Sequence, residues 1–133
     1  MIYSTTNGTR AVLAAAAACE TVFLGSLLNL SAAAGAVDED CVIVCAGFQG
    51  RFALDDAYCA GRIVDLLGGE VTDAARASAI LARSFPTAWD GIMARTYGPP
   101  GLDADIEFCS QENTIDVVPR FSRMVESAAE IVR

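Results

Sequence analysis

Short apolar runs alternate with longer helix-like segments through the first half of the chain. The runs expected to form strands are Ile2–Ser4, Thr21–Leu24 and Cys41–Cys45, and the helices expected after them are Ala11–Cys19, Asn29–Gly35 and Leu54–Leu67. Strands that alternate with helices in this way usually build a buried parallel sheet covered by helices. The pattern therefore predicts an α/β fold with a mainly parallel sheet.

The second half of the chain is mostly helical in its pattern. Gly68 and Gly69 are expected to end the third helix, while Thr72 and Pro86 mark the starts of two further helices. The remaining expected elements are helices at Asp73–Ser84, Thr87–Thr96 and Asp103–Ser110, a strand at Ile115–Val118 and an amphipathic tail helix at Phe121–Val132. Because no low-complexity linker interrupts the sequence, we expect residues 1–133 to form a single domain.

The three strand-to-helix loops are the natural place for a ligand. Right-handed crossovers bring such loops to one edge of a parallel sheet, where open α/β proteins bind their ligands. The loop residues expected to converge there are Asn7, Gly8, Ser26, Asn29, Gly47 and Gly50.

The first loop has the residue types of an anion site. Thr6, Asn7, Gly8 and Thr9 can aim hydroxyls and backbone N–H groups at one anion, and Arg10 adds a guanidinium suited to phosphate or sulfonate. The alternative is an ordinary capped helix start, with Asn7 or Thr9 as the N-cap and Arg10 solvated.

Composition narrows the possible chemistry. The net charge is −8, which argues against nucleic acid as a partner, and no apolar run is long enough to span a membrane. The chain has no histidine, which excludes Ser-His-Asp and Cys-His catalysis and imidazole-dependent zinc sites. Catalysis would have to use carboxylates, hydroxyls, thiols, Arg or a hard metal held by oxygen ligands.

Five cysteines are expected to be reduced and mostly buried, as in a cytoplasmic protein. They lie at Cys19, Cys41, Cys45, Cys59 and Cys109, an odd number without a Cys-x-x-Cys pair. The spacing from Cys45 to Arg51 fits a Cys-x5-Arg phosphatase cradle, although the residues between them resemble such a cradle only loosely. Buried or supporting thiols are the favoured interpretation.

Two adjacent acids open the third helix directly after the third loop. Acidic residues in a first helical turn are favoured by the helix dipole alone, so Asp55 and Asp56 can be ordinary helix-start residues. The functional alternative is a Mg²⁺ ligand or a general acid or base that faces the ligand edge. Arg51, in the third loop, is a further candidate for anion binding.

Several other polar and aromatic residues are expected to have structural roles. Solvated helix surface is the favoured interpretation of Asp103, Asp105, Glu107 and Arg62, and helix packing that of Phe85, Trp89 and Tyr97. No Gly-x-Gly-x-x-Gly or Walker sequence supports a nucleotide-binding module.

Three ordered blocks resemble the 2-phosphosulfolactate phosphatase family, whose enzymes act in coenzyme M biosynthesis. The blocks are Thr5–Arg10, Gly25–Asn29 and Cys45–Gly61, with further similarity at Asp105–Ser110 and Val117–Pro119. The resemblance implies an α/β/α sandwich. It also implies that this chain corresponds to the C-terminal portion of a member, with roughly the first 100 residues of the family lacking a counterpart.

The family resemblance implies Mg²⁺-dependent hydrolysis of a small acidic phosphate monoester, such as 2-phosphosulfolactate, to 3-sulfolactate and phosphate. Asp55 and Asp56 are the expected catalytic residues, with Asp56 as the metal ligand. Gly47, Gly50 and Arg51 are expected to join the first loop, Thr6–Arg10, in binding the substrate.

The alternative is a non-catalytic homologue, or one half of a split protein, that keeps an anion-binding loop. A sheet that starts with the first residues would have an uncovered edge. We therefore expect a homo-oligomer or a partner N-terminal segment to complete it.

Overall fold

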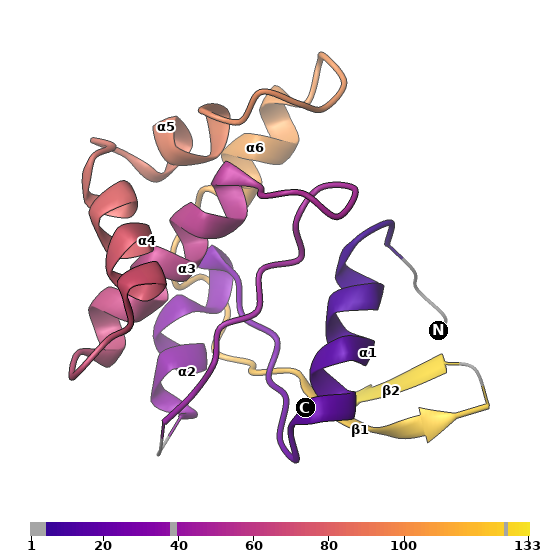
Figure 1. Cartoon of the computed structure of the whole chain (residues 1–133). Helices are drawn as coiled ribbons and strands as arrows, with labels where there is room; N and C mark the ends of the chain where they lie inside the picture. The colour runs from indigo at the N-terminus through magenta and orange to yellow at the C-terminus, as the bar shows by residue number, and fades with distance from the viewer. Residues whose placement is uncertain (1–4, 38–39, 127) are drawn as a thin grey trace.

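The computed structural model describes residues 5–37, 40–126 and 128–133, and the strand expected at Ile2–Ser4 lies outside them. Its elements, in chain order, are α1 (Gly8–Ala18), a 3-10 turn η1 (Leu27–Asn29), α2 (Leu30–Gly35), α3 (Leu54–Leu67), α4 (Asp73–Arg83), α5 (Ala88–Met93), α6 (Asp103–Cys109), β1 (Arg120–Val125) and β2 (Ala128–Val132). The helices α2 to α6 lie together, while α1 and the β1–β2 hairpin lie on the other side of the molecule (Figure 1). The chain is thus a mixed α/β structure.

The hydrophobic core lies within the helical group. Its central buried side chains are Leu27, Leu30, Tyr58, Ala82, Ile92 and Ile106. Tyr58 and Leu30 are the largest side chains that are almost completely shielded from water. Since Tyr58 is on α3, the helix whose first turn carries Asp55 and Asp56 is anchored at the centre of the core.

A close crossing joins α3 to α4. A Cβ atom at Gly61 would lie 2.0 Å from the carbonyl oxygen of Ser78 and 2.8 Å from the Cβ of Ala82. Gly91 on α5 has the same kind of role, since a Cβ there would lie 2.4 Å from the Tyr58 ring. The two glycines let neighbouring elements pack closely around α3.

Six of the seven expected helices are present, with small differences at their ends. The third helix has both predicted bounds, Leu54 and Leu67, and ends at Gly68, whose φ of +66° favours glycine. Thr72 and Thr87 cap α4 and α5 by accepting the N–H groups of Ala75 and Asp90. These local signals account for the success of the helix predictions.

The tail prediction was wrong. A helix was expected at Phe121–Val132, but the residues form the antiparallel β1–β2 hairpin, with Phe121 opposite Ile131. Arg123 donates to Glu130 across the two strands at 3.0 Å. Cross-strand pairs of this kind stabilise a hairpin, and the apolar spacing of the tail is compatible with either structure.

The described residues do not form the expected parallel sheet. Phe23, in the expected strand Thr21–Leu24, makes a single antiparallel bridge to Arg120, and the N–H of Leu24 donates to the carbonyl of Pro119 at 2.8 Å. The expected strand Ile115–Val118 is likewise irregular, and the N–H of Ile115 donates to the carbonyl of Leu28. The residues around Phe23 are thus paired antiparallel with the start of β1 and not in a parallel sheet.

The apolar run Cys41–Cys45 also departs from the prediction, because it belongs to no strand. Val42 is 80% exposed and Val44 is 51% exposed. An apolar strand is buried only when neighbouring strands and covering helices enclose it. Within the described part of the chain, this segment has no such neighbours in a sheet.

Among the described residues, no helix combines the length and the apolar character needed to cross a bilayer.

Candidate functional site

A tight turn lies directly before α3. Phe48 and Arg51 exchange two backbone hydrogen bonds of 3.0 Å each, which closes a two-residue hairpin loop of Gln49 and Gly50. Both loop residues have positive φ, +53° and +76°, as a type I′ turn requires. Gly47 also has a positive φ, and a Cβ there would lie 2.7 Å from the carbonyl oxygen of Arg51. We call residues 47–51 the glycine turn.

Asp56 ties the glycine turn to the start of α3. Its Oδ2 accepts the N–H of Gly47 at 2.6 Å. Burial raises the pKa of the Asp56 carboxyl, and the negative charge of Asp55 raises it further, while the Gly47 N–H lowers it. A half-buried carboxylate with a raised pKa is better able to accept a proton than a solvated one.

The first loop meets the same turn through Asn7. The N–H of Gln49 donates to Asn7 Oδ1 at 3.1 Å, although the two residues are 42 positions apart. Asn7 precedes α1 but makes no side-chain cap bond to it. The predicted approach of the first and third loops is therefore observed at this contact.

The other residues of the first loop support the helix start. The hydroxyl of Thr9 accepts the N–H of Thr5 at 3.0 Å, and the hydroxyl of Thr5 accepts the N–H of Thr9 at 3.1 Å. Gly8 begins α1, and both Thr6 and Arg10 are exposed. Asn7 occupies the N-cap position, as the capping interpretation allowed, but its side chain bonds to the third loop, and Thr9 lies within α1.

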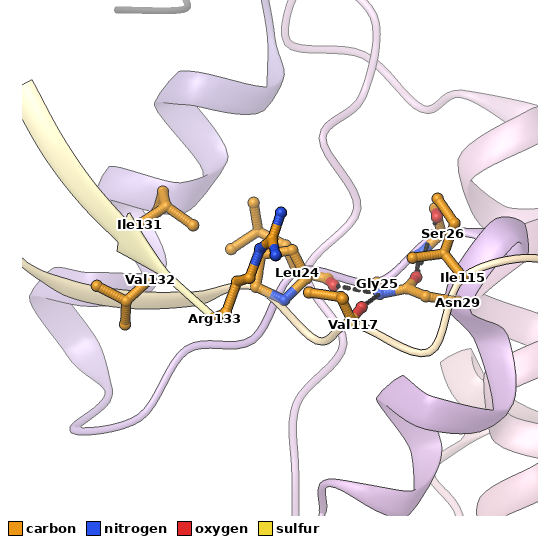
Figure 2. Close-up of a pocket in the computed structure, with 10 residues that line it drawn as sticks. Leu24, Gly25, Ser26, Asn29, Ile115, Val117, Ile131, Val132 and Arg133 are labelled. Atoms are coloured by element: carbon orange, nitrogen blue, oxygen red, sulfur yellow. Dashed lines mark hydrogen bonds between the residues drawn. The ribbon is translucent and has the colours of Figure 1, made fainter. Parts of the chain in front are cut away.

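Two residues expected at this edge are placed elsewhere. The buried Asn29 side chain donates to the carbonyls of Leu24 and Val117, and its Oδ1 accepts from Ser26 (Figure 2). These groups line a largely apolar pocket of about 620 Å³ together with Ile115 and the chain end. The contacts of Asn29 are structural, because they hold the second loop to the segment before β1.

Two residues that the sequence did not single out for the site contact Asp55. The Tyr97 hydroxyl donates to Asp55 Oδ1, and Arg95 Nη1 lies 3.7 Å from Asp55 Oδ2. The Tyr97 ring stacks on Phe48 of the glycine turn, with ring centres 4.1 Å apart and planes 13° apart. Burial and the bond to Asp55 raise the pKa of Tyr97, so its hydroxyl stays a proton donor.

These contacts correct the expectation that Tyr97 packs among helices, which holds for Phe85 and Trp89 at the edge of the core. Arg62 is also not simply solvated, because it donates to Tyr58 and pairs with Glu112. The acids of α6, in contrast, are exposed as expected; they are Asp103, Asp105 and Glu107.

The cysteine alternative gains no support from the geometry. Four of the six N–H groups after Cys45 are bonded to protein oxygens, those of Gly47, Phe48, Gln49 and Arg51. A phosphatase cradle needs such groups free for the anion. Although much of the Cys45 residue is exposed, partial burial of its thiol and the negative charge of Asp56 raise the pKa of Cys45, which disfavours a reactive thiolate.

The cysteines are free thiols, but the prediction that most are buried was wrong. Only Cys59 is partly buried, and burial with nearby negative charge raises its pKa to about 12. Cys41 and Cys45 are exposed because the segment that carries them has no sheet around it, and Cys19 and Cys109 are exposed at the ends of α1 and α6.

A metal site of three or more protein ligands is not present in the described part of the chain. Mg²⁺ nevertheless commonly binds through one or two carboxylates plus substrate oxygens and waters. Asp55 is engaged by Tyr97 and Arg95, whereas Asp56 has one oxygen bonded to Gly47. Asp56 is therefore the better donor for such a cation.

Comparisons with known proteins find relatives of one family. The family model described as 2-phosphosulpholactate phosphatase matches residues 1–124. Proteins named probable 2-phosphosulfolactate phosphatase from Thermus thermophilus and Caldanaerobacter subterraneus are each 39% identical, over 90% of this chain and 55% and 54% of their own lengths. One from Symbiobacterium thermophilum is 32% identical over 92% of this chain and 58% of its own. The chain thus spans about half the length of the curated relatives it matches.

Proposed function

The chain belongs to the 2-phosphosulfolactate phosphatase family, and we propose that it carries part of a Mg²⁺-dependent phosphatase site. The substrate is a small acidic phosphate monoester such as 2-phosphosulfolactate, which is hydrolysed to 3-sulfolactate and phosphate. The observation that supports this most is the meeting of Asn7, the glycine turn and Asp56 at the start of α3. Asn7 is about 40 residues away in sequence from the glycine turn, whereas Asp56 follows that turn closely.

Asp56 is the working carboxylate in this proposal. With its raised pKa, Asp56 can accept a proton from an attacking water or hold the cation beside the phosphoryl group. Mg²⁺, when bound, would neutralise phosphoryl oxygens and acidify a bound water. The water oxygen bonds to phosphorus, the bond from phosphorus to the substrate oxygen breaks, and that oxygen leaves with a proton as the alcohol.

In this proposal, Arg10 and Arg51 supply the cationic side chains that bind the substrate. Both are exposed, on the first turn of α1 and at the end of the glycine turn. In the complete family fold, with the parallel α/β/α sandwich that the resemblance implies, we propose that they face the sulfonate, carboxylate or phosphate of the substrate. Thr6, Gly8 and Gly50 would border the same space.

A second candidate is a non-catalytic half that needs a partner segment or a second copy. It is favoured by the exposed valines of Cys41–Cys45 and by the four occupied N–H groups of the glycine turn. The segment would then become a sheet strand only after a complementary polypeptide pairs with it. For both candidate functions, we propose a cytoplasmic location.

The deciding experiment measures phosphate release from 2-phosphosulfolactate with Mg²⁺ or EDTA. The chain is tested alone and with the N-terminal segment of a relative added. We expect Mg²⁺-dependent release in at least one form, and a loss of about 100-fold or more in Asp56→Asn. Asp103→Asn, an exposed acid of α6, is the matched control and keeps its activity. Release that survives EDTA and is abolished by Cys45→Ser contradicts the proposal, and no release in either form favours the second candidate.

Arg10 provides a separate test of substrate binding. Arg10→Ala should weaken the affinity for 2-phosphosulfolactate about tenfold or more in calorimetry, because a charge-assisted contact is worth ~1.5–3 kcal/mol. Arg76→Ala, which removes an exposed arginine of α4, should leave the affinity unchanged. Equal affinity of the Arg10 variant and the wild type would return Arg10 to the solvated helix surface.

A further inference from the structure

We propose that Arg95 and Tyr97 are positioning residues that hold Asp55 as an anchor and, through Phe48, fix the glycine turn against Asp56. This inference rests on the proposed function, since it concerns the same site. It assigns different tasks to the two adjacent acids: Asp55 binds the protein and Asp56 acts on the ligand.

The carboxylate of Asp55 is surrounded by donors from the protein. Oδ1 accepts the Tyr97 hydroxyl and the N–H of Asp56, the latter at 3.0 Å, and Oδ2 faces the Arg95 guanidinium. The side chains of Arg95 and Asp55 are only 18% and 20% exposed. A pair shielded to this degree is less screened by solvent than a surface ion pair, and its geometry is correspondingly more fixed.

The stacked rings of Tyr97 and Phe48 connect Asp55 to the glycine turn. Phe48 is the residue directly before the two turn residues, and its ring lies flat on Tyr97. On one side Tyr97 holds Asp55, and on the other Phe48 holds the turn whose Gly47 N–H reaches Asp56. The contacts therefore close a ring around the first turn of α3.

The segment that contributes Arg95 and Tyr97 is itself shaped for this approach. It follows α5, which ends at Met93, and it ends at Gly98 with a φ of +107°. A Cβ at Gly98 would lie 3.5 Å from the Arg95 guanidinium. The chain thus turns back beside Arg95 at a position that favours glycine.

The positioning role is tested with Tyr97→Phe, which removes the hydroxyl and keeps the ring for stacking. Tyr58→Phe is the matched control, because the hydroxyl that it removes is bonded to Arg62 and not to Asp55. The first readout is the Gly47 amide proton in NMR spectra recorded across pH. Its chemical shift follows ionisation of Asp56 as long as the two are hydrogen bonded.

We expect the pH-dependent change at Gly47 to fall by roughly half or more in Tyr97→Phe and to persist in Tyr58→Phe. In the active form, kcat should fall about tenfold or more with KM nearly unchanged, as expected for misplaced reacting groups. An unchanged Gly47 titration in Tyr97→Phe, or an equal loss in Tyr58→Phe, overturns the inference. A response at Gly47 without phosphate release in any form instead overturns the proposed function and leaves the positioning contacts established.

Discussion

Gly61 provides a quantitative test of the packing that supports the site. It lies in the middle of α3, where a Cβ would be 2.0 Å from the Ser78 carbonyl oxygen and 2.8 Å from the Cβ of Ala82. The main obstacle is backbone, so rotation of a flexible side chain cannot relieve the clash. The Gly61→Ala substitution must therefore separate α3 from α4.

Two opposing effects set the size of the change. Replacement of a helix-interior glycine by alanine favours the helix by about 1 kcal/mol. Overpacking costs about 1–3 kcal/mol, and contact with backbone places this site at the upper end. We therefore expect the free energy of unfolding to fall by about 2 kcal/mol. For a typical urea dependence, this lowers the unfolding midpoint by about 1 M.

The assay is urea unfolding followed by circular dichroism at the helical band. Gly35→Ala is the matched control, because Gly35 ends α2 and a Cβ there would meet nothing within 4 Å. The control should stay within about 0.5 kcal/mol of the wild type or be slightly more stable. If Gly61→Ala unfolds at the same urea concentration as Gly35→Ala, the close crossing of α3 and α4 is wrong.

The remaining predictions concern titration and reactivity. Asp55→Asn should lower the pKa of Asp56, because the negative charge of Asp55 raises that pKa. The control Asp103→Asn should leave the pKa of Asp56 unchanged, and NMR titration of the Asp56 carboxyl measures both variants. An unchanged or higher pKa of Asp56 in Asp55→Asn contradicts the assignment. Cys59 should react with a thiol reagent at pH 8 far more slowly than Cys109, because Cys59 is partly buried and its pKa is raised to about 12. Equal reaction rates at Cys59 and Cys109 would contradict this prediction.

The helices were predictable because their signals are local. Thr72 and Thr87 each accept the N–H three residues later, and Gly68 supplies the left-handed conformation that ends α3. Such signals need no knowledge of the rest of the chain. The bounds of α3 could therefore be predicted at both ends.

The strands were less predictable because their partners are distant. Cys41–Cys45 has a strand composition, but strand formation depends on neighbouring strands, and the described chain offers none. The two halves of the tail pair with each other as antiparallel strands, with Phe121 opposite Ile131. Apolar spacing alone did not separate this hairpin from an amphipathic helix.

The contact between the first and third loops could be predicted because glycine and polar residues mark both loops. Gly47, Gly50 and Asn7 are of this kind, and the structure brings the first loop to the glycine turn. Tyr97 was missed because its contact to Asp55 joins residues 42 positions apart and has no periodic or motif signal. Only the folded chain shows that the segment after α5 reaches α3.

The different surroundings of Asp55 and Asp56 follow from their place at a helix start. Consecutive residues of an α-helix point about 100° apart, so two adjacent acids necessarily face different neighbours. Asp55 faces Arg95 and Tyr97, which satisfy its charge, whereas Asp56 faces Gly47 and is partly buried with one N–H donor. The two residues are both aspartates, but their different environments give them different properties. A carboxylate held by protein donors suits an anchor, and one with a raised pKa beside two converging loops suits proton or cation binding.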